Sequence, residues 1–160
     1  MTDFIFSVYI VENILKEIQK LSKKYNLEVF GYLVGEIFKW ENKKYILIED
    51  QIFIESGTNS TPYTVSQIEG TAGLYEESFQ RLKQEKINPN LRIVGWWHSH
   101  PGFGCFLSKT DVQTQSYFFP EPFQVALVID PLKNEFNFFN QDENSKHGYK
   151  PISYAVVSSK

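Results

Sequence analysis

The sequence predicts an α/β domain in which helices flank a central mixed β-sheet. Apolar runs typical of buried strands occupy residues 29–34 and 124–129. Residues 10–25 and 68–86 instead carry apolar side chains at helical spacing. A chain of 160 residues is long enough to bury one core, and no linker-like stretch divides it. We therefore expect residues 1–160 to form a single domain.

Turn-forming residues and changes of apolar period set the expected order of the elements. Asn88-Pro89 closes the second helical pattern, and Pro120-Glu121-Pro122 closes a third. The expected order is a strand at 4–8, a helix over 10–25, a strand at 29–34, a hairpin turn at 39–44, a strand at 45–55, a loop at 56–66, a helix over 68–86, a strand with residues 94–97 in its interior, a helix over 108–117, and strands at 124–129, 135–139 and 151–157.

Charge and cysteine content exclude several classes of protein. The net charge is −3, and the 16 basic and 19 acidic residues are mixed along the chain, so no basic block indicates a nucleic-acid partner. No apolar run is long enough to cross a bilayer, which argues against a membrane protein. The one cysteine rules out an intramolecular disulfide. We expect a cytoplasmic protein with protein partners.

The densest group of polar residues lies between residues 94 and 111. Val94, Gly95, Trp96 and Trp97 have the pattern of a strand interior, and Pro101-Gly102 is a strand-ending signal. Side chains alternate along an extended chain, so His98 and His100 project to one side while Ser99 points away. Two imidazoles are therefore expected together where a strand meets a loop.

A downstream acid completes a possible metal site. Ser108 and Asp111 have the spacing of a helix capping box, which would place Asp111 in the first helical turn, where it could face the strand end. Two histidine nitrogens and one carboxylate oxygen suit one zinc ion per chain and leave the fourth tetrahedral position for water. On spacing alone, solvated histidines and a simple capping box remain an alternative. A cysteine nucleophile at Cys105, assisted by the histidines, is a further one.

Residues 98–111 match the pattern H-[ST]-H-P-x6-S-x2-D. This stretch resembles the motif of the JAMM (MPN+) zinc metalloprotease family, with His98, His100, Ser108 and Asp111 at the family's positions. The residues around the motif are similar to the deubiquitinating branch, and the similarity extends over nearly the whole chain. The resemblance implies an MPN domain, that is, a cytidine-deaminase-like sandwich of a mixed sheet and helices.

The same family uses a glutamate upstream of a G-x-L-x-G strand. Glu28 stands before Gly31-Tyr32-Leu33-Val34-Gly35, so the resemblance assigns it the catalytic acid–base role. Physical reasoning alone leaves Glu12, Glu36 and Glu49 open. The resemblance also implies that Ser108 donates a hydrogen bond to the oxyanion.

The resemblance implies a zinc-dependent isopeptidase or peptidase that cuts after the C-terminal tail of ubiquitin or a ubiquitin-like protein. An MPN-type or conjugation-system protein is a possible further partner. In the family, an insertion supplies a strand edge for the substrate tail, and residues 57–66 correspond to it, with Pro62, Tyr63, Thr64 and Val65 as substrate-binding candidates. The alternatives are a non-catalytic MPN scaffold and a zinc amidase with another substrate.

Overall fold

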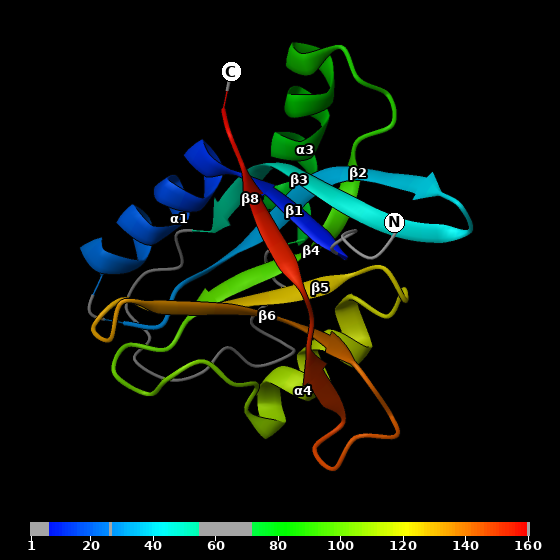
Figure 1. Cartoon of the computed structure of the whole chain (residues 1–160). Coiled ribbons are helices and arrows are strands. Elements are labelled where there is room, and N and C mark those ends of the chain that lie inside the picture. The colour runs from blue at the N-terminus through cyan, green and yellow to red at the C-terminus, as the bar shows by residue number, and fades with distance from the viewer. Residues whose placement is uncertain (1–6, 26, 55–71, 160) are drawn as a thin grey trace.

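The computed structural model describes residues 7–25, 27–54 and 72–159. Within these residues, eight strands form one sheet in the order β7-β6-β5-β4-β2-β3-β1-β8, and three helices pack on it (Figure 1). The elements are β1 (Val8–Val11), α1 (Glu12–Lys24), β2 (Phe30–Trp40), β3 (Lys43–Ile54), α3 (Ala72–Lys86), β4 (Arg92–Ser99), α4 (Lys109–Phe118), β5 (Val125–Asp130), β6 (Glu135–Gln141), β7 (Tyr149–Pro151) and β8 (Tyr154–Val157). The predicted α/β class is confirmed.

Strand β4 lies in the middle of the sheet, where both neighbours hold it. It runs antiparallel to β2 and parallel to β5, so the sheet is mixed. His98 stands opposite Phe30 of β2 on one side and Val128 of β5 on the other. Because the flanking residues are buried, the carboxyl end of β4 is fixed in place. This end carries the two histidines of the motif.

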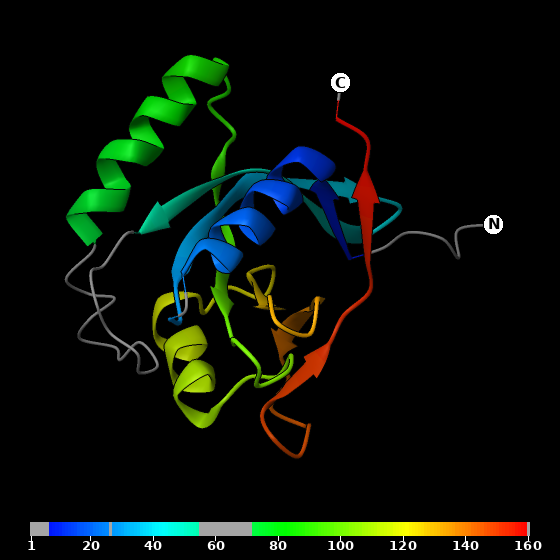
Figure 2. The ribbon, with the colours of Figure 1, turned by 90° about the vertical axis from the view of Figure 1, so that its left-hand side faces the viewer.

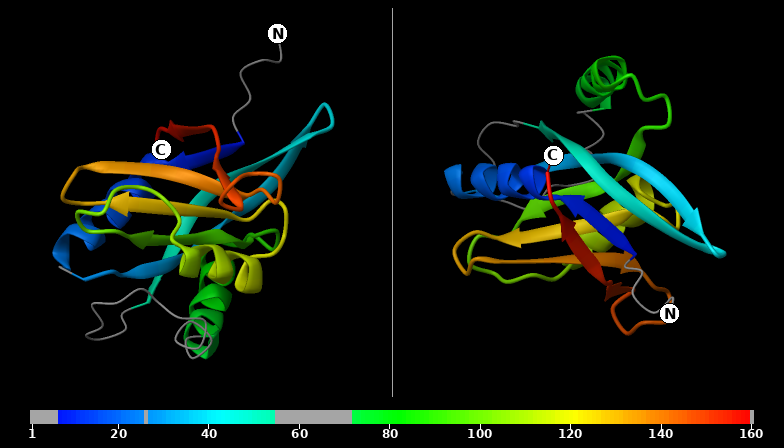
Figure 3. Two further views of the ribbon diagram at one scale, coloured as in Figure 1. Left: turned by 90° about the horizontal axis from the view of Figure 1, so that it is seen from below. Right: turned by 45° about the horizontal axis from the view of Figure 1, so that its top comes forward.

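Each face of the curved sheet has its own apolar core. Helix α1 covers one face, where Leu15 and Ile18 pack with Trp97. Helices α3 and α4 cover the other face, which includes Trp96 (Figure 2). Figure 3 shows α1, α3 and α4 around the sheet from two further directions. The consecutive tryptophans thus point to opposite faces, as alternation along a strand requires.

The N-terminal boundary differs from the sequence prediction. Residues 8–11 form β1, and α1 begins at Glu12, although Ile10 and Val11 were assigned to the helix. Strand β1 lies between β3 and β8 and is parallel to both. Apolar spacing cannot distinguish the last residues of a strand from the start of a helix. Pairing with β3 and β8 makes residues 8–11 a strand here.

Other boundaries agree more closely. The β2–β3 hairpin turns at Glu41 and Asn42, which have positive φ values of 45° and 67° and lie within the predicted turn. The strand expected at residues 151–157 is instead two short strands, β7 and β8, at opposite edges of the sheet. No helix in the described ranges is long and apolar enough to cross a membrane.

Candidate metal centre

His98 and His100 lie at the carboxyl end of β4 and point to the same side. Both are buried. The ring of His98 stacks on Trp96, two residues before it, with centroids 4.3 Å apart and planes at 13°. The indole N–H of Trp96 is in turn bound by the side chain of Gln115 on α4. Trp96 of β4, itself bonded to Gln115 of α4, therefore supports one face of the His98 ring.

Asp111 reaches the histidines from the first turn of α4. Ser108 is the N-cap of this helix: its Oγ accepts the N–H of Asp111 at 3.1 Å, and its own N–H donates to Asp111 Oδ2 at 2.8 Å. The predicted capping box is confirmed. The capping box fixes the Asp111 carboxylate, because Ser108 binds both the backbone N–H and the side-chain oxygen of Asp111.

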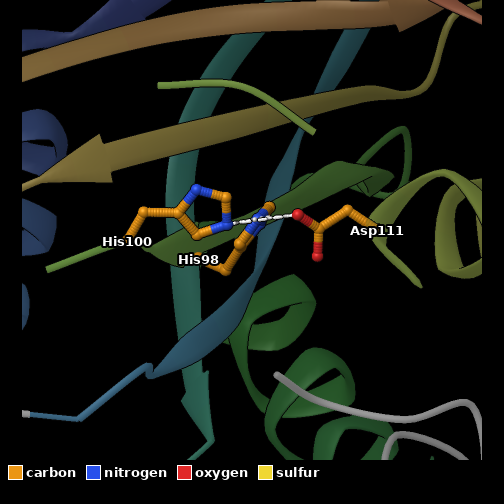
Figure 4. A group of neighbouring side chains, drawn as sticks. All are labelled: His98, His100 and Asp111. Atoms are coloured by element: carbon orange, nitrogen blue, oxygen red, sulfur yellow. Dashed lines mark hydrogen bonds and ion pairs between the residues drawn. The ribbon is translucent and has the colours of Figure 1, made fainter. Parts of the chain in front are cut away.

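The three side chains converge on one point (Figure 4). Asp111 Oδ2 lies 3.1 Å from Nε2 of His98 and 3.1 Å from Nε2 of His100, and the two Nε2 atoms are also 3.1 Å apart. Donor atoms about 2.0–2.2 Å from a tetrahedral zinc ion lie roughly 3.3–3.6 Å from one another. The triangle is therefore close to the base of a zinc tetrahedron. A buried donor set of two imidazoles and one carboxylate fits zinc.

Electrostatics favours the metal-binding forms of His98 and Asp111. Burial lowers the pKa of His98 and keeps this ring neutral near pH 7. Burial also opposes the charging of His100, but the hydrogen bond and charge of Asp111 outweigh it and raise the pKa of His100. Although burial acts to raise the pKa of Asp111, its interactions with the two histidines and the hydrogen bond from the Ser108 N–H lower it strongly. Asp111 is therefore an anion beside two imidazoles.

Glu28 lies just before β2 and is half-buried. Burial raises the pKa of its carboxyl group; the charge of His100 lowers it, and the charge of Asp111 raises it. Glu28 is thus within electrostatic reach of the histidine and aspartate group. A raised pKa suits a group that must first accept a proton and later give it up.

Ser99 links the Glu28 segment to the strand that carries the histidines. The Ser99 hydroxyl accepts the N–H of Val29 at 3.0 Å and donates to the carbonyl of Leu27 at 3.4 Å. The Ser99 N–H also donates to the Val29 carbonyl at 3.0 Å. Strand alternation correctly predicts that Ser99 points away from the histidines. It predicts no role for Ser99, because the bond to Val29 joins residues about 70 positions apart in the chain.

Two hydrogen-bonding groups near the site are incompletely used by the described residues. Ser108 Oγ accepts one bond, and none of those residues accepts the proton of its hydroxyl, which leaves that donor for a ligand. Nδ1 of His98 is buried and has no partner among the residues that the structure covers. A bound metal at Nε2 would make Nδ1 a donor in need of an acceptor.

Two further candidates have different outcomes. Cys105 follows the histidine loop, but its Sγ contacts the carbonyl of Val128 at 3.5 Å, and burial raises its pKa. A thiol of that kind is a weak nucleophile at neutral pH. The substrate-binding candidates Pro62, Tyr63, Thr64 and Val65 lie outside the described residues.

Comparison with known families agrees with this geometry. The family described as "JAB1/Mov34/MPN/PAD-1 ubiquitin protease" matches residues 4–120. The chain belongs to this family. The resemblance to JAMM/MPN+ proteins is therefore confirmed, and the His98, His100 and Asp111 group lies within the matched part of this MPN domain.

Curated relatives cover the same region. The chain is 38% identical over 112 residues to "COP9 signalosome complex subunit 5" of Debaryomyces hansenii, a match that covers 68% of this chain and 22% of the relative. It is 33% identical over 126 residues to "26S proteasome non-ATPase regulatory subunit 14" of Dictyostelium discoideum, covering 76% of this chain and 37% of the relative. The MPN domain thus matches well under half the length of these two relatives.

A solved structure supports the fold independently. Protein DSY2949 from Desulfitobacterium hafniense superposes with a TM-score of 0.65 over 95% of this chain and 94% of its own, at 16% sequence identity. At this identity, the similarity supports the overall fold alone.

Proposed function

We propose that this MPN domain is a zinc-dependent isopeptidase or peptidase that hydrolyses the bond after the C-terminal tail of ubiquitin or a ubiquitin-like protein. The observation that carries the proposal is the triangle formed by the two Nε2 atoms and Asp111 Oδ2, with sides of 3.1 Å. Two imidazole nitrogens that face each other at this distance compete for one proton, and a bound cation would instead take the lone pairs of both.

His98, His100 and Asp111 would hold the zinc ion. When bound, zinc would supply a Lewis acid for the scissile carbonyl and would lower the pKa of water toward neutrality. A set of three protein ligands is typical of catalytic zinc sites.

Glu28 would transfer protons during the reaction, and Ser108 would stabilise the developing negative charge. Glu28 accepts a proton from the attacking water and delivers it to the leaving amine nitrogen, a role for which its raised pKa is suited. The Ser108 hydroxyl donates a hydrogen bond to the carbonyl oxygen of the substrate as negative charge develops there. Removing one such donor typically costs about 100–1,000-fold in rate.

The substrate class rests on the family. Its description names a ubiquitin protease, and the relatives named above are subunits of the signalosome and of the proteasome. We infer a ubiquitin-like substrate, and a protein complex of comparable kind as the possible partner. Residues 62–65 stay a prediction for the tail-binding strand.

A panel of ubiquitin-like proteins, each fused through its last glycine to a reporter peptide, tests the proposal. Zinc-loaded protein should release the reporter from at least one fusion, a chelator should stop release, and added zinc should restore it. The panel also separates the alternatives, because an amidase with another substrate would bind zinc but leave every fusion intact. A scaffold would bind a fusion without cutting it.

A further inference from the structure

Asp130 lies at the carboxyl end of β5 and is fully buried, yet it is a charged residue outside the candidate metal centre. Its carboxylate accepts four backbone hydrogen bonds. Oδ1 accepts the N–H groups of Gly102, Leu132 and Lys133 at 2.9, 3.0 and 3.1 Å, and Oδ2 accepts that of Gly104 at 2.7 Å.

These bonds tie two loops to one side chain. Leu132 and Lys133 belong to the turn that follows β5, whereas Gly102 and Gly104 belong to the loop that follows β4 and His100. Burial acts to raise the pKa of Asp130, but the four N–H donors together lower it. The carboxylate is therefore ionised, and charge-assisted bonds of this kind are about twice as strong as neutral ones.

The loop that Asp130 holds returns to the metal centre through Gly104. The Gly104 carbonyl lies 3.2 Å from Nδ1 of His100. A carbonyl oxygen can only accept, so Nδ1 of His100 carries the proton in this contact, and Nε2 is the ring nitrogen that a metal ion would take. The backbone N–H of His100 also donates to the Ile129 carbonyl of β5 at 2.8 Å. Residues of β5 therefore fix both the backbone and, through Gly104, the ring of His100.

We propose that Asp130 is a positioning residue for the metal centre: through the backbone of Gly104 it orients the His100 ring and keeps Nε2 available as a ligand. The inference rests on the proposed zinc function. Acceptors for the second nitrogen of a ligating histidine typically contribute about 10–100-fold to metal affinity. Here that acceptor is the carbonyl of Gly104. The position of this carbonyl depends on Asp130, which anchors the loop.

The chain contains a matched control in the loop after β6. Asp142 likewise organises a tight loop, accepting the N–H of Asn144 at 3.0 Å and the hydroxyl of Ser145 at 2.8 Å. Within the described part of the chain, no hydrogen bond joins Asp142 or its loop to His98, His100 or Asp111.

The first test compares Asp130→Asn with Asp142→Asn. Asparagine keeps one oxygen acceptor and loses the other together with the charge, so the Gly104 carbonyl should shift. We expect the zinc dissociation constant of Asp130→Asn, measured by competition with a chelator, to rise about 10–100-fold. The constant for Asp142→Asn should stay at the wild-type value.

A second readout follows the His100 ring directly. In the zinc-loaded wild-type protein, the Nδ1 proton of His100 should appear in NMR spectra as a slowly exchanging imidazole N–H, because Gly104 covers it. In Asp130→Asn this resonance should exchange faster or disappear, while backbone resonances of β1 and α1 stay unchanged. A general loss of packing would move both sets.

A second variant covers the case in which Asp130→Asn does not fold. Gly104 and Gly148 have positive φ values of 85° and 83°, and a Cβ at either position would meet no atom closer than 3.5 Å. Alanine therefore strains both backbones alike, by about 1–2 kcal/mol. Only Gly104→Ala should weaken zinc binding, and Gly148→Ala serves as its control.

The possible outcomes separate the two proposals. Wild-type protein that binds no zinc rejects the proposed function and this inference with it. Wild-type protein that binds zinc tightly, with Asp130→Asn and Gly104→Ala within about twofold of it, overturns the inference alone and leaves the zinc function standing. Equal losses in the variants and their controls would also overturn it.

Discussion

The hydroxyl of Ser99 accepts the backbone N–H of Val29 at 3.0 Å, so the residue between the two histidines is bonded to the residue after Glu28. The same hydroxyl donates to the carbonyl of Leu27, the residue before Glu28. One fully buried serine thus fixes the segment on both sides of the candidate base relative to the candidate ligands.

Ser99→Ala should therefore impair catalysis more than metal binding. The alanine leaves the Val29 N–H without its side-chain acceptor and frees the Glu28 segment, and misplacement by about 1 Å can cost roughly 100-fold in rate. We expect kcat/KM for a ubiquitin-like fusion to fall at least tenfold, with zinc content unchanged. Ser22→Ala is the matched control, because Ser22 is also fully buried and bonds only within α1. Equal activity of both variants would remove Ser99 from the account.

Zinc content should depend on two of the three histidines. His98→Ala combined with His100→Ala removes two donors of the 3.1 Å triangle and should reduce the zinc measured by metal analysis from one ion per chain to none. His147→Ala removes the third histidine, which lies outside this group, and should keep the ion. If the double variant retained zinc, the ion would have to bind elsewhere in the chain.

Cys105→Ser should keep most of the peptidase activity. The thiol has a raised pKa because of burial, and its Sγ contacts the Val128 carbonyl, so little thiolate is available for attack. Steady-state cleavage of a fusion substrate measures this. Complete loss of activity in a folded, zinc-loaded variant would instead support the nucleophilic cysteine.

The stability contribution of Asp130 should depend on pH. Because its folded-state pKa is lowered from 3.8, Asp130 stabilises the fold above the unfolded-state value, and this contribution is lost as the pH falls through the folded-state pKa. We expect Asp130→Asn to lower the free energy of unfolding of zinc-free protein by about 1–3 kcal/mol at pH 7. Urea unfolding curves should show this difference unchanged from pH 7 to about pH 5 and shrinking below pH 4. A difference independent of pH would mean that the charge contributes nothing.

Local patterns were enough to predict most of the fold and the clustering of His98, His100 and Asp111. The alternation that places His98 and His100 on one side is a property of any strand, and the capping box of Ser108 and Asp111 is a property of any helix start. Both depend on residues close in sequence. That is why the sequence predicts them, and why the resemblance to the JAMM motif could be stated for the same four residues.

Contacts between distant segments could not be predicted in this way. Ser99 with Val29 and Asp130 with Gly104 are joined only when β4 pairs with its neighbours, and no local pattern indicates either bond. The boundary at Glu12 was misplaced for a related reason, because β1 is a strand only through its pairing with β3 and β8. Tertiary pairing overrides a local preference in each case.

The Glu28→Gln variant, loaded with one zinc ion, tests whether Glu28 transfers the proton in zinc-dependent cleavage. The product is the free ubiquitin-like protein ending in its last glycine, measured by intact mass against time beside wild-type protein with the same zinc content. Glutamine keeps the shape but cannot accept the proton, so cleavage should slow by about 100–10,000-fold while zinc content and melting temperature hold. Cleavage by Glu28→Gln at the wild-type rate would show that Glu28 is not the general base.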